Sequence, residues 1–147
     1  MKPVDQTIVA DKIGDCLRAC VCSLLELPIE AVPNFAECGF FDGLDKWLDE
    51  RGLLFIRFKI PDDGYRNEKY DSELSHKAIW FGYAGQEGNP DYMLAWGQSP
   101  RNDAEGKPRQ HIVVAQANGY GVKVAHDPHE SRAGLVKICG FGWIVKA

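Results

Sequence analysis

The sequence lacks any long hydrophobic run. No stretch approaches the length of about 18 apolar residues that a membrane-spanning helix needs. Residues 1–15 also lack the apolar core of a signal peptide. We therefore expect a cytoplasmic protein with no membrane partner.

An excess of charge of one sign is absent as well. The net charge is −4, and the lysines and arginines are scattered along the chain. Proteins that bind nucleic acid usually concentrate basic residues on one face, so we expect no nucleic-acid partner. The hydrophobic fraction of 45% and the charged fraction of 26% are typical of a globular protein. A chain of 147 residues without an internal repeat predicts a single domain over 1–147.

The cysteines form no regular framework. There are five of them, an odd number, at Cys16, Cys20, Cys22, Cys38 and Cys139. This set is typical of reduced thiols rather than of a disulfide scaffold. The spacing of the first three matches no common zinc site, so we expect no metal. Cys20 and Cys22 are predicted to lie in or near the core.

Helical patterns come first along the chain. A helix is predicted to begin at Cys16, with Asp15 as its N-cap, and to end at Leu27-Pro28. A second helix is predicted before Gly52. The apolar stripe that predicts it consists of Phe40, Leu44, Trp47 and Leu48.

Strand patterns follow the helices. The polar stretches 61–76 and 97–110 contain Gly and Pro and are predicted to be loops. Helices followed by strands predict an α+β domain with a mostly antiparallel sheet. The strand-like runs are 53–60, 77–85, 92–98, 111–117, 121–127 and 141–147.

The last two internal runs flank Asn118-Gly119-Tyr120, which is a strong hairpin signal. A three-residue loop places His111 opposite Asp127 and gathers apolar residues on one face. A two-residue turn would instead pair His111 with His126. We prefer the first register, and a β-bulge could reconcile the two.

A histidine held by a carboxylate is half of a nucleophile–base–orienter triad. Cys16 can supply the nucleophile, because amide groups at a helix N-terminus stabilise a thiolate and an imidazolium nearby would lower the thiol pKa further. Taken alone, Cys16 is more simply interpreted as a buried structural thiol. His126 and His129 compete with His111 for the role of base.

Another candidate lies just before the histidine strand. Ser99-Pro100-Arg101 could reach a carboxylate or a carbonyl of a substrate. A plain turn is an equally good interpretation of these three residues.

These residues together resemble the papain-like cysteine peptidase fold. The closest subgroup is the bacteriocin-processing C39 type, in which a His-apolar-Val-Val strand leads to an Asp-Pro pair, as in residues 111–114 and in Asp127-Pro128. The stretches GDC (14–16), SPR (99–101) and HDPH (126–129) look like those of small phage and bacterial proteins with this fold. The resemblance implies a helix that carries the cysteine, packed on the antiparallel sheet.

The resemblance also implies an oxyanion donor. Papain-like enzymes carry a glutamine shortly before the cysteine. Here the usual position is occupied by Ala10, and Gln6 takes the role only if the loop from residue 7 to residue 14 bulges.

The implied activity is acyl hydrolysis without a cofactor, most simply the cleavage of a peptide or isopeptide bond in a protein or peptide substrate. The implied catalytic residues are Cys16, His111, Asp127 and Gln6. One alternative is a transglutaminase or deamidase that acts on a glutamine side chain. Another is an inactive, phage-encoded binding module. If the chain is phage-encoded, its location is the host cytoplasm.

Overall fold

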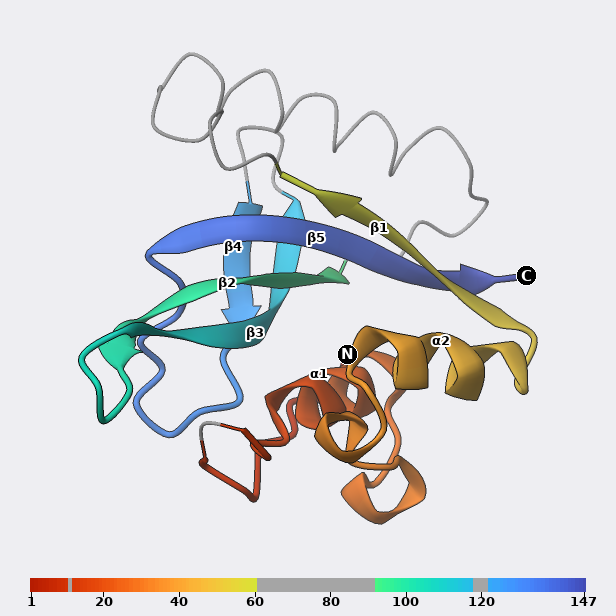
Figure 1. Ribbon diagram of the computed structural model, residues 1–147. Coiled ribbons are helices and arrows are strands. Elements are labelled where there is room, and N and C mark those ends of the chain that lie inside the picture. The colour runs from red at the N-terminus through yellow and green to blue at the C-terminus, as the bar shows by residue number, and fades with distance from the viewer. Residues whose placement is uncertain (11, 61–91, 118–121) are drawn as a thin grey trace.

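The computed structural model describes residues 1–10, 12–60, 92–117 and 122–147. The strand expected at 77–85, the loop expected at 61–76 and the turn residues Asn118-Gly119-Tyr120 lie outside this part of the chain. Within it, two α-helices and two short 3₁₀ helices precede all the strands of a five-stranded antiparallel sheet (Figure 1). The predicted α+β class is confirmed.

Helix α1 spans Cys16–Leu25, so Cys16 is its first residue as predicted. It ends at Glu26, which has a left-handed backbone (φ 55°) and whose N–H donates to the Cys22 carbonyl. A left-handed residue with such a bond is a common way to close a helix. Cys20 and Cys22 are fully buried, which confirms their prediction as core residues.

Two 3₁₀ helices, η1 (Ile29–Ala31) and η2 (Phe35–Glu37), lead to helix α2 (Phe41–Asp49). The prediction that Phe40 belongs to the buried stripe of α2 is wrong. Phe40 precedes the helix with φ 53° and is 44% exposed. Phe41 packs inward instead, with its ring centroid 4.9 Å from that of Trp96.

The sheet has the strand order β1-β5-β2-β3-β4. Its strands are β1 (Leu53–Lys59), β2 (Tyr92–Asn102), β3 (Pro108–Ala117), β4 (Val122–His126) and β5 (Lys137–Lys146). The loop predicted over 97–110 is wrong for most of its length, because β2 and β3 continue through it. Only residues 103–107 form the turn, which is closed where the Asp103 N–H donates to the Lys107 carbonyl at 2.8 Å. These strand ends are polar and escape a search for apolar alternation.

The hairpin of β3 and β4 follows neither register considered from the sequence. Gln116 pairs with Lys123 near the turn, whereas Val114 pairs with His126 further along. The shift between these pairs leaves Ala125 as an extra residue in β4, which is the mark of a β-bulge. A bulge was expected as a means of reconciling the registers, but the pairing itself differs from both.

Both helices lie on the same side of the sheet (Figure 1). The core on this side is formed by apolar residues of the helices together with Leu94, Ile112 and Val114 from β2 and β3. Alternate residues of the same strands, such as Met93 and Val113, pack on the opposite face. In the part of the chain that the structure describes, no helix is long and apolar enough to cross a membrane.

Candidate active site

A buried pair of His111 and Asp127 stands at the centre of the candidate site. His111 Nε2 lies 2.7 Å from Asp127 Oδ1, and the side chains are only 4% and 2% exposed. The contact predicted between these two residues is therefore present, although the predicted register is not. Asp127 follows the last residue of β4, so its side chain rather than direct strand pairing reaches His111.

The Asp127 carboxylate is held by three donors. Besides His111, the backbone N–H of His129 donates to Oδ1 at 2.9 Å and that of Gly134 donates to Oδ2 at 2.7 Å. Burial alone would raise the pKa of Asp127, but these hydrogen bonds outweigh it and lower the pKa to about 2. Asp127 is therefore an anion at neutral pH.

This anion fixes the tautomer of a neutral His111. A carboxylate can only accept hydrogen bonds, so Nε2 of His111 must carry the proton that it donates to Asp127. The lone pair of the neutral ring is then on Nδ1. A base that takes a proton from a nucleophile would use this second nitrogen.

Cys16 borders the same cavity as His111. The cavity has a volume of about 290 Å³, and its lining residues include Gln6, Cys16, Phe40, Arg101, His111 and His129. The Cys16 side chain is partly buried and lies against β3, where a backbone hydrogen bond at Ile112 lowers the thiol pKa. The start of helix α1 and the strand β3 that carries His111 thus meet at one cavity.

The expected lowering of the Cys16 pKa is wrong. Burial raises the pKa of Cys16 and exceeds the opposite effect of the backbone hydrogen bonds at Ile112, Leu17 and Cys16 itself. The nearby charge of Asp15 also raises it. Cys16 therefore rests as a thiol at neutral pH, and a reaction at its sulfur needs a base.

The segment before α1 brings Gln6 to the cavity. The backbone N–H of Gln6 donates to the Pro128 carbonyl at 3.0 Å, directly beside Asp127. Its Nε2 donates to the Ile8 carbonyl at 3.2 Å. Gln6 thus lines the cavity together with Cys16, although ten residues separate them in the sequence.

Asp15 organises this segment, although not as predicted. It stands at the N-cap position, but its side chain makes no capping hydrogen bond. Its fully buried carboxylate instead accepts from the N–H and hydroxyl of Thr7 and from the N–H of Ile8, at distances of 2.7–3.2 Å. An acidic residue next to the cysteine was visible in the sequence, but nothing there showed that it binds residues 7 and 8.

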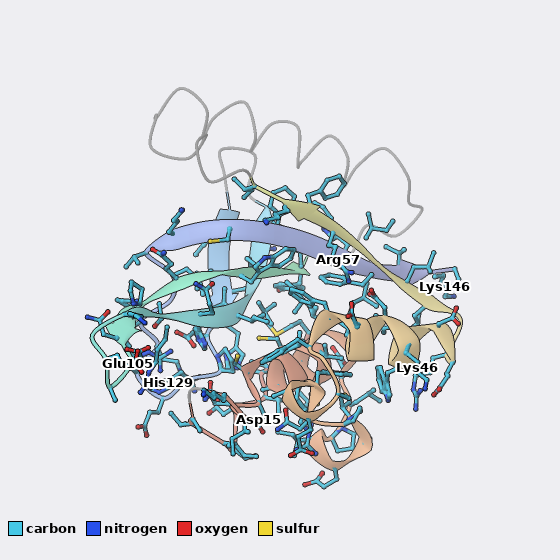
Figure 2. The ribbon with its side chains drawn as sticks, viewed as in Figure 1. Asp15, Lys46, Arg57, Glu105, His129 and Lys146 are labelled. Carbon is cyan, nitrogen blue, oxygen red and sulfur yellow. The ribbon has the colours of Figure 1, made fainter. Side chains whose placement is uncertain are left out.

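The two competing histidines have other partners. His126 Nε2 lies 2.9 Å from the Val4 carbonyl oxygen, where it helps to hold the N-terminal segment. His129 lines the cavity, but the N–H of Ser131 donates to its Nδ1 at 3.0 Å. In Figure 2, His129 lies between the β2–β3 turn, marked by Glu105, and Asp15 at the start of α1. His111 is thus the histidine that combines a carboxylate partner with access to the cavity of Cys16.

Two cavity residues differ in part from what the sequence predicted. The plain turn considered for Ser99-Pro100-Arg101 is wrong, because these residues belong to β2, and Arg101 lines the cavity. Phe40, expected in the core, lines it too. A left-handed phenylalanine before a helix has no reliable signature in a single sequence.

Removal of the Asp15 carboxylate is expected to loosen the segment that carries Gln6. Asp15→Ala removes a fully buried carboxylate that accepts hydrogen bonds from Thr7 and Ile8, so we expect a loss of about 3 kcal/mol in the free energy of unfolding. Urea denaturation measures this loss, and amide hydrogen exchange at Thr7 and Ile8 should accelerate. The control is Asp5→Ala, which removes an exposed carboxylate paired with Arg132 and should cost less than about 1 kcal/mol. Equal losses in the two variants would contradict this account of Asp15.

The Asp127 carboxylate is expected to make the free energy of unfolding depend on pH in the acid range. Its pKa is about 2 in the folded chain against an ordinary value of 3.8. The resulting stabilisation, about 2 kcal/mol, is present above pH 3.8 and is lost as the pH falls toward 2. Asp127→Asn should be less stable than the unaltered protein at neutral pH. Its free energy of unfolding should fall less when the pH is lowered. Urea denaturation at a series of pH values tests this, and an unchanged acid dependence in the variant would count against it.

Cys16 should alkylate more slowly than the exposed Cys38 at neutral pH, because burial favours its thiol form. Iodoacetamide labelling followed by peptide mass spectrometry gives both rates in one sample. The rate at Cys16 should keep rising as the pH passes 9. Faster labelling of Cys16 than of Cys38 in mild acid, abolished by His111→Ala, would instead demonstrate a preformed thiolate–imidazolium pair.

The chain was also compared with known proteins. No protein-family model, no curated protein and no solved structure matches it. Any role for Cys16, His111, Asp127 and Gln6 therefore rests on the geometry of this chain.

Proposed function

We propose that this protein is a papain-like cysteine acyl hydrolase that cleaves a peptide or isopeptide bond. The observation that carries the proposal is the buried His111–Asp127 pair, which borders the same cavity as Cys16 at the start of α1. The arrangement of a helix bearing a cysteine against an antiparallel sheet supports the papain-like assignment. All five cysteines are free, in keeping with the reducing cytoplasm that we infer.

In the first half of the proposed reaction, His111 acts as a general base. Nδ1 takes the proton from Cys16 Sγ while the sulfur attacks the acyl carbon, so a C–S bond forms as the carbonyl becomes an oxyanion. Asp127 stabilises the imidazolium through Nε2. The tetrahedral intermediate then collapses, the acyl–nitrogen bond breaks, and the amine leaves with the proton from Nδ1.

Water completes the cycle. His111 removes a proton from the water that attacks the thioester, and the same proton returns to Cys16 Sγ as the C–S bond breaks. The products are a carboxylic acid and an amine, and no cofactor takes part. Because burial holds Cys16 as a thiol, transfer of its proton to His111 belongs to the attack itself.

The oxyanion needs hydrogen-bond donors in the cavity. The Cys16 N–H at the helix start is one candidate, and Gln6 Nε2 is the other. Gln6 Nε2 now donates to the Ile8 carbonyl at 3.2 Å, so it must turn toward the substrate to serve in this way.

A mixture of denatured-proteome peptides tests the proposal. Incubation in ¹⁸O water and mass spectrometry should reveal new carboxyl ends that carry the label. Cys16→Ala and His111→Ala should each reduce the yield at least about 1,000-fold, because members of a triad act as a unit. Cys38→Ala, which removes an exposed thiol, should leave the yield unchanged.

The other outcomes have distinct meanings. Release of ammonia from glutamine side chains, or incorporation of an added amine, would assign a deamidase or a transglutaminase and overturn hydrolysis of a backbone or isopeptide bond. No product from a folded protein would overturn the enzyme proposal in favour of a binding module.

A further inference from the structure

The cavity that contains Cys16 has walls of different chemistry. Arg101 near the end of β2 and Arg109 near the start of β3 provide guanidinium groups. Val9 and Phe40 provide apolar surface, and both are about half exposed. A substrate that fills the cavity therefore meets positive charge as well as an apolar wall.

Arg101 is held in place by a buried hydroxyl. Ser99 is 1% exposed, and its Oγ accepts from Arg101 Nε at 2.9 Å and from the Arg101 backbone N–H at 3.2 Å. These bonds fix the Nε edge of the guanidinium and leave its outer N–H groups available to a ligand. A side chain fixed in this way loses less conformational entropy when it binds an anion.

Among the described residues, the guanidinium of Arg101 forms no ion pair. Over residues 1–10, 12–60, 92–117 and 122–147, no ion pair joins Arg101 to an acidic side chain. Asp103 also lines the cavity, but its Oδ1 accepts from the N–H groups of Glu105 and Lys107 in its own turn.

The field of Arg101 reaches into the cavity. Burial lowers the pKa of His129, and the charge of Arg101 lowers it further. His129 is itself a cavity residue, and its ring centroid is 6.3 Å from that of His111. A positive charge thus acts close to the histidine that we propose as the base.

We propose that Arg101 is a specificity-determining residue that binds a carboxylate of the acyl substrate. The carboxylate is either an acidic side chain near the scissile bond or the C-terminal carboxylate of a peptide. This inference rests on the proposed function for its substrate, but anion binding beside Cys16 can be measured without turnover. The apolar wall of Val9 and Phe40 would contact the adjoining part of the same substrate.

A pair of alkylating reagents tests the anion site. Iodoacetate carries a carboxylate, whereas iodoacetamide is its neutral counterpart of nearly the same shape. The ratio of their rates at one cysteine does not depend on the fraction of thiolate, since that fraction is common to both reactions. We therefore measure the iodoacetate-to-iodoacetamide ratio at Cys16 and divide it by the ratio at the exposed Cys38 in the same sample.

The normalised ratio should exceed one in the unaltered protein and should fall about fivefold in Arg101→Gln, a modest change typical of a single partly exposed charge. Arg101→Lys should retain most of the normalised ratio of the unaltered protein. The control Arg51→Gln removes an exposed arginine beyond the other end of α2 and should leave the ratio unchanged. Thermal unfolding checks that each variant is folded.

Two results with the variants would overturn the proposal. One is an unchanged ratio in folded Arg101→Gln, and the other is an equal fall in Arg51→Gln, which would indicate only the net charge of the protein. If Arg101→Gln does not fold, the salt dependence of the ratio in the unaltered protein still tests the proposal. Its normalised ratio at Cys16 should fall as salt is added, because salt screens the attraction. A ratio of one at low salt would refute the site.

Peptide substrates then separate the sources of the carboxylate. Matched peptides with Asp or Asn, and with free or amidated C-termini, should show which carboxylate raises kcat/KM and that Arg101→Gln removes the preference. Equal cleavage of all four peptides would overturn the proposal. If no peptide is cleaved but the alkylation ratio behaves as expected, the proposed hydrolase fails while the carboxylate site at Arg101 is upheld.

Discussion

A single buried negative charge, that of Asp127, is what the site depends on. Its two oxygens accept hydrogen bonds from a ring on β3 and from two backbone amides in the connection between β4 and β5. A buried carboxylate is costly unless all its acceptors are used, and here several donors compensate for the loss of water. The same contacts that compensate the charge also orient His111 and fix its tautomer, so stability and chemistry at this point cannot be separated.

A second buried carboxylate plays the corresponding part on the helix side. Asp15 holds residues 7 and 8 beside the start of α1, and the Gln6 N–H reaches the Pro128 carbonyl next to Asp127. The segment that carries Gln6 is thus fixed at two points. One contact is with Asp15, which precedes the proposed nucleophile, and the other is with Pro128, which follows the proposed orienting residue. The cavity is lined by residues from several different elements and from the segment before α1. The two acidic residues hold these parts of the chain in position relative to one another.

Patterns of short range allowed much of this arrangement to be predicted. Helical periodicity was sufficient for α1 and for Cys16 as its first residue, and the order of helices and strands was sufficient for the α+β class. The contact of His111 with Asp127 was reached from a register that proved wrong, because a bulge in β4 and the reach of a side chain replaced the expected direct pairing. The raised pKa of Cys16 and the exposed Phe40 were missed for a common reason. Each depends on what lies next to the residue in space, and a sequence pattern does not report burial between distant elements.

The hydrogen bond between His126 and the Val4 carbonyl joins residues 122 positions apart. Closing so long a loop carries a large entropic cost that local contacts cannot offset, so this contact forms only after the sheet has brought β4 to the helices. The segment around Val4 is synthesised before β4 and can dock only after β4 has followed it. During synthesis, therefore, the nascent chain carries its cysteine without a finished cavity around it, and reactivity of the kind that we infer would begin only at the completion of folding.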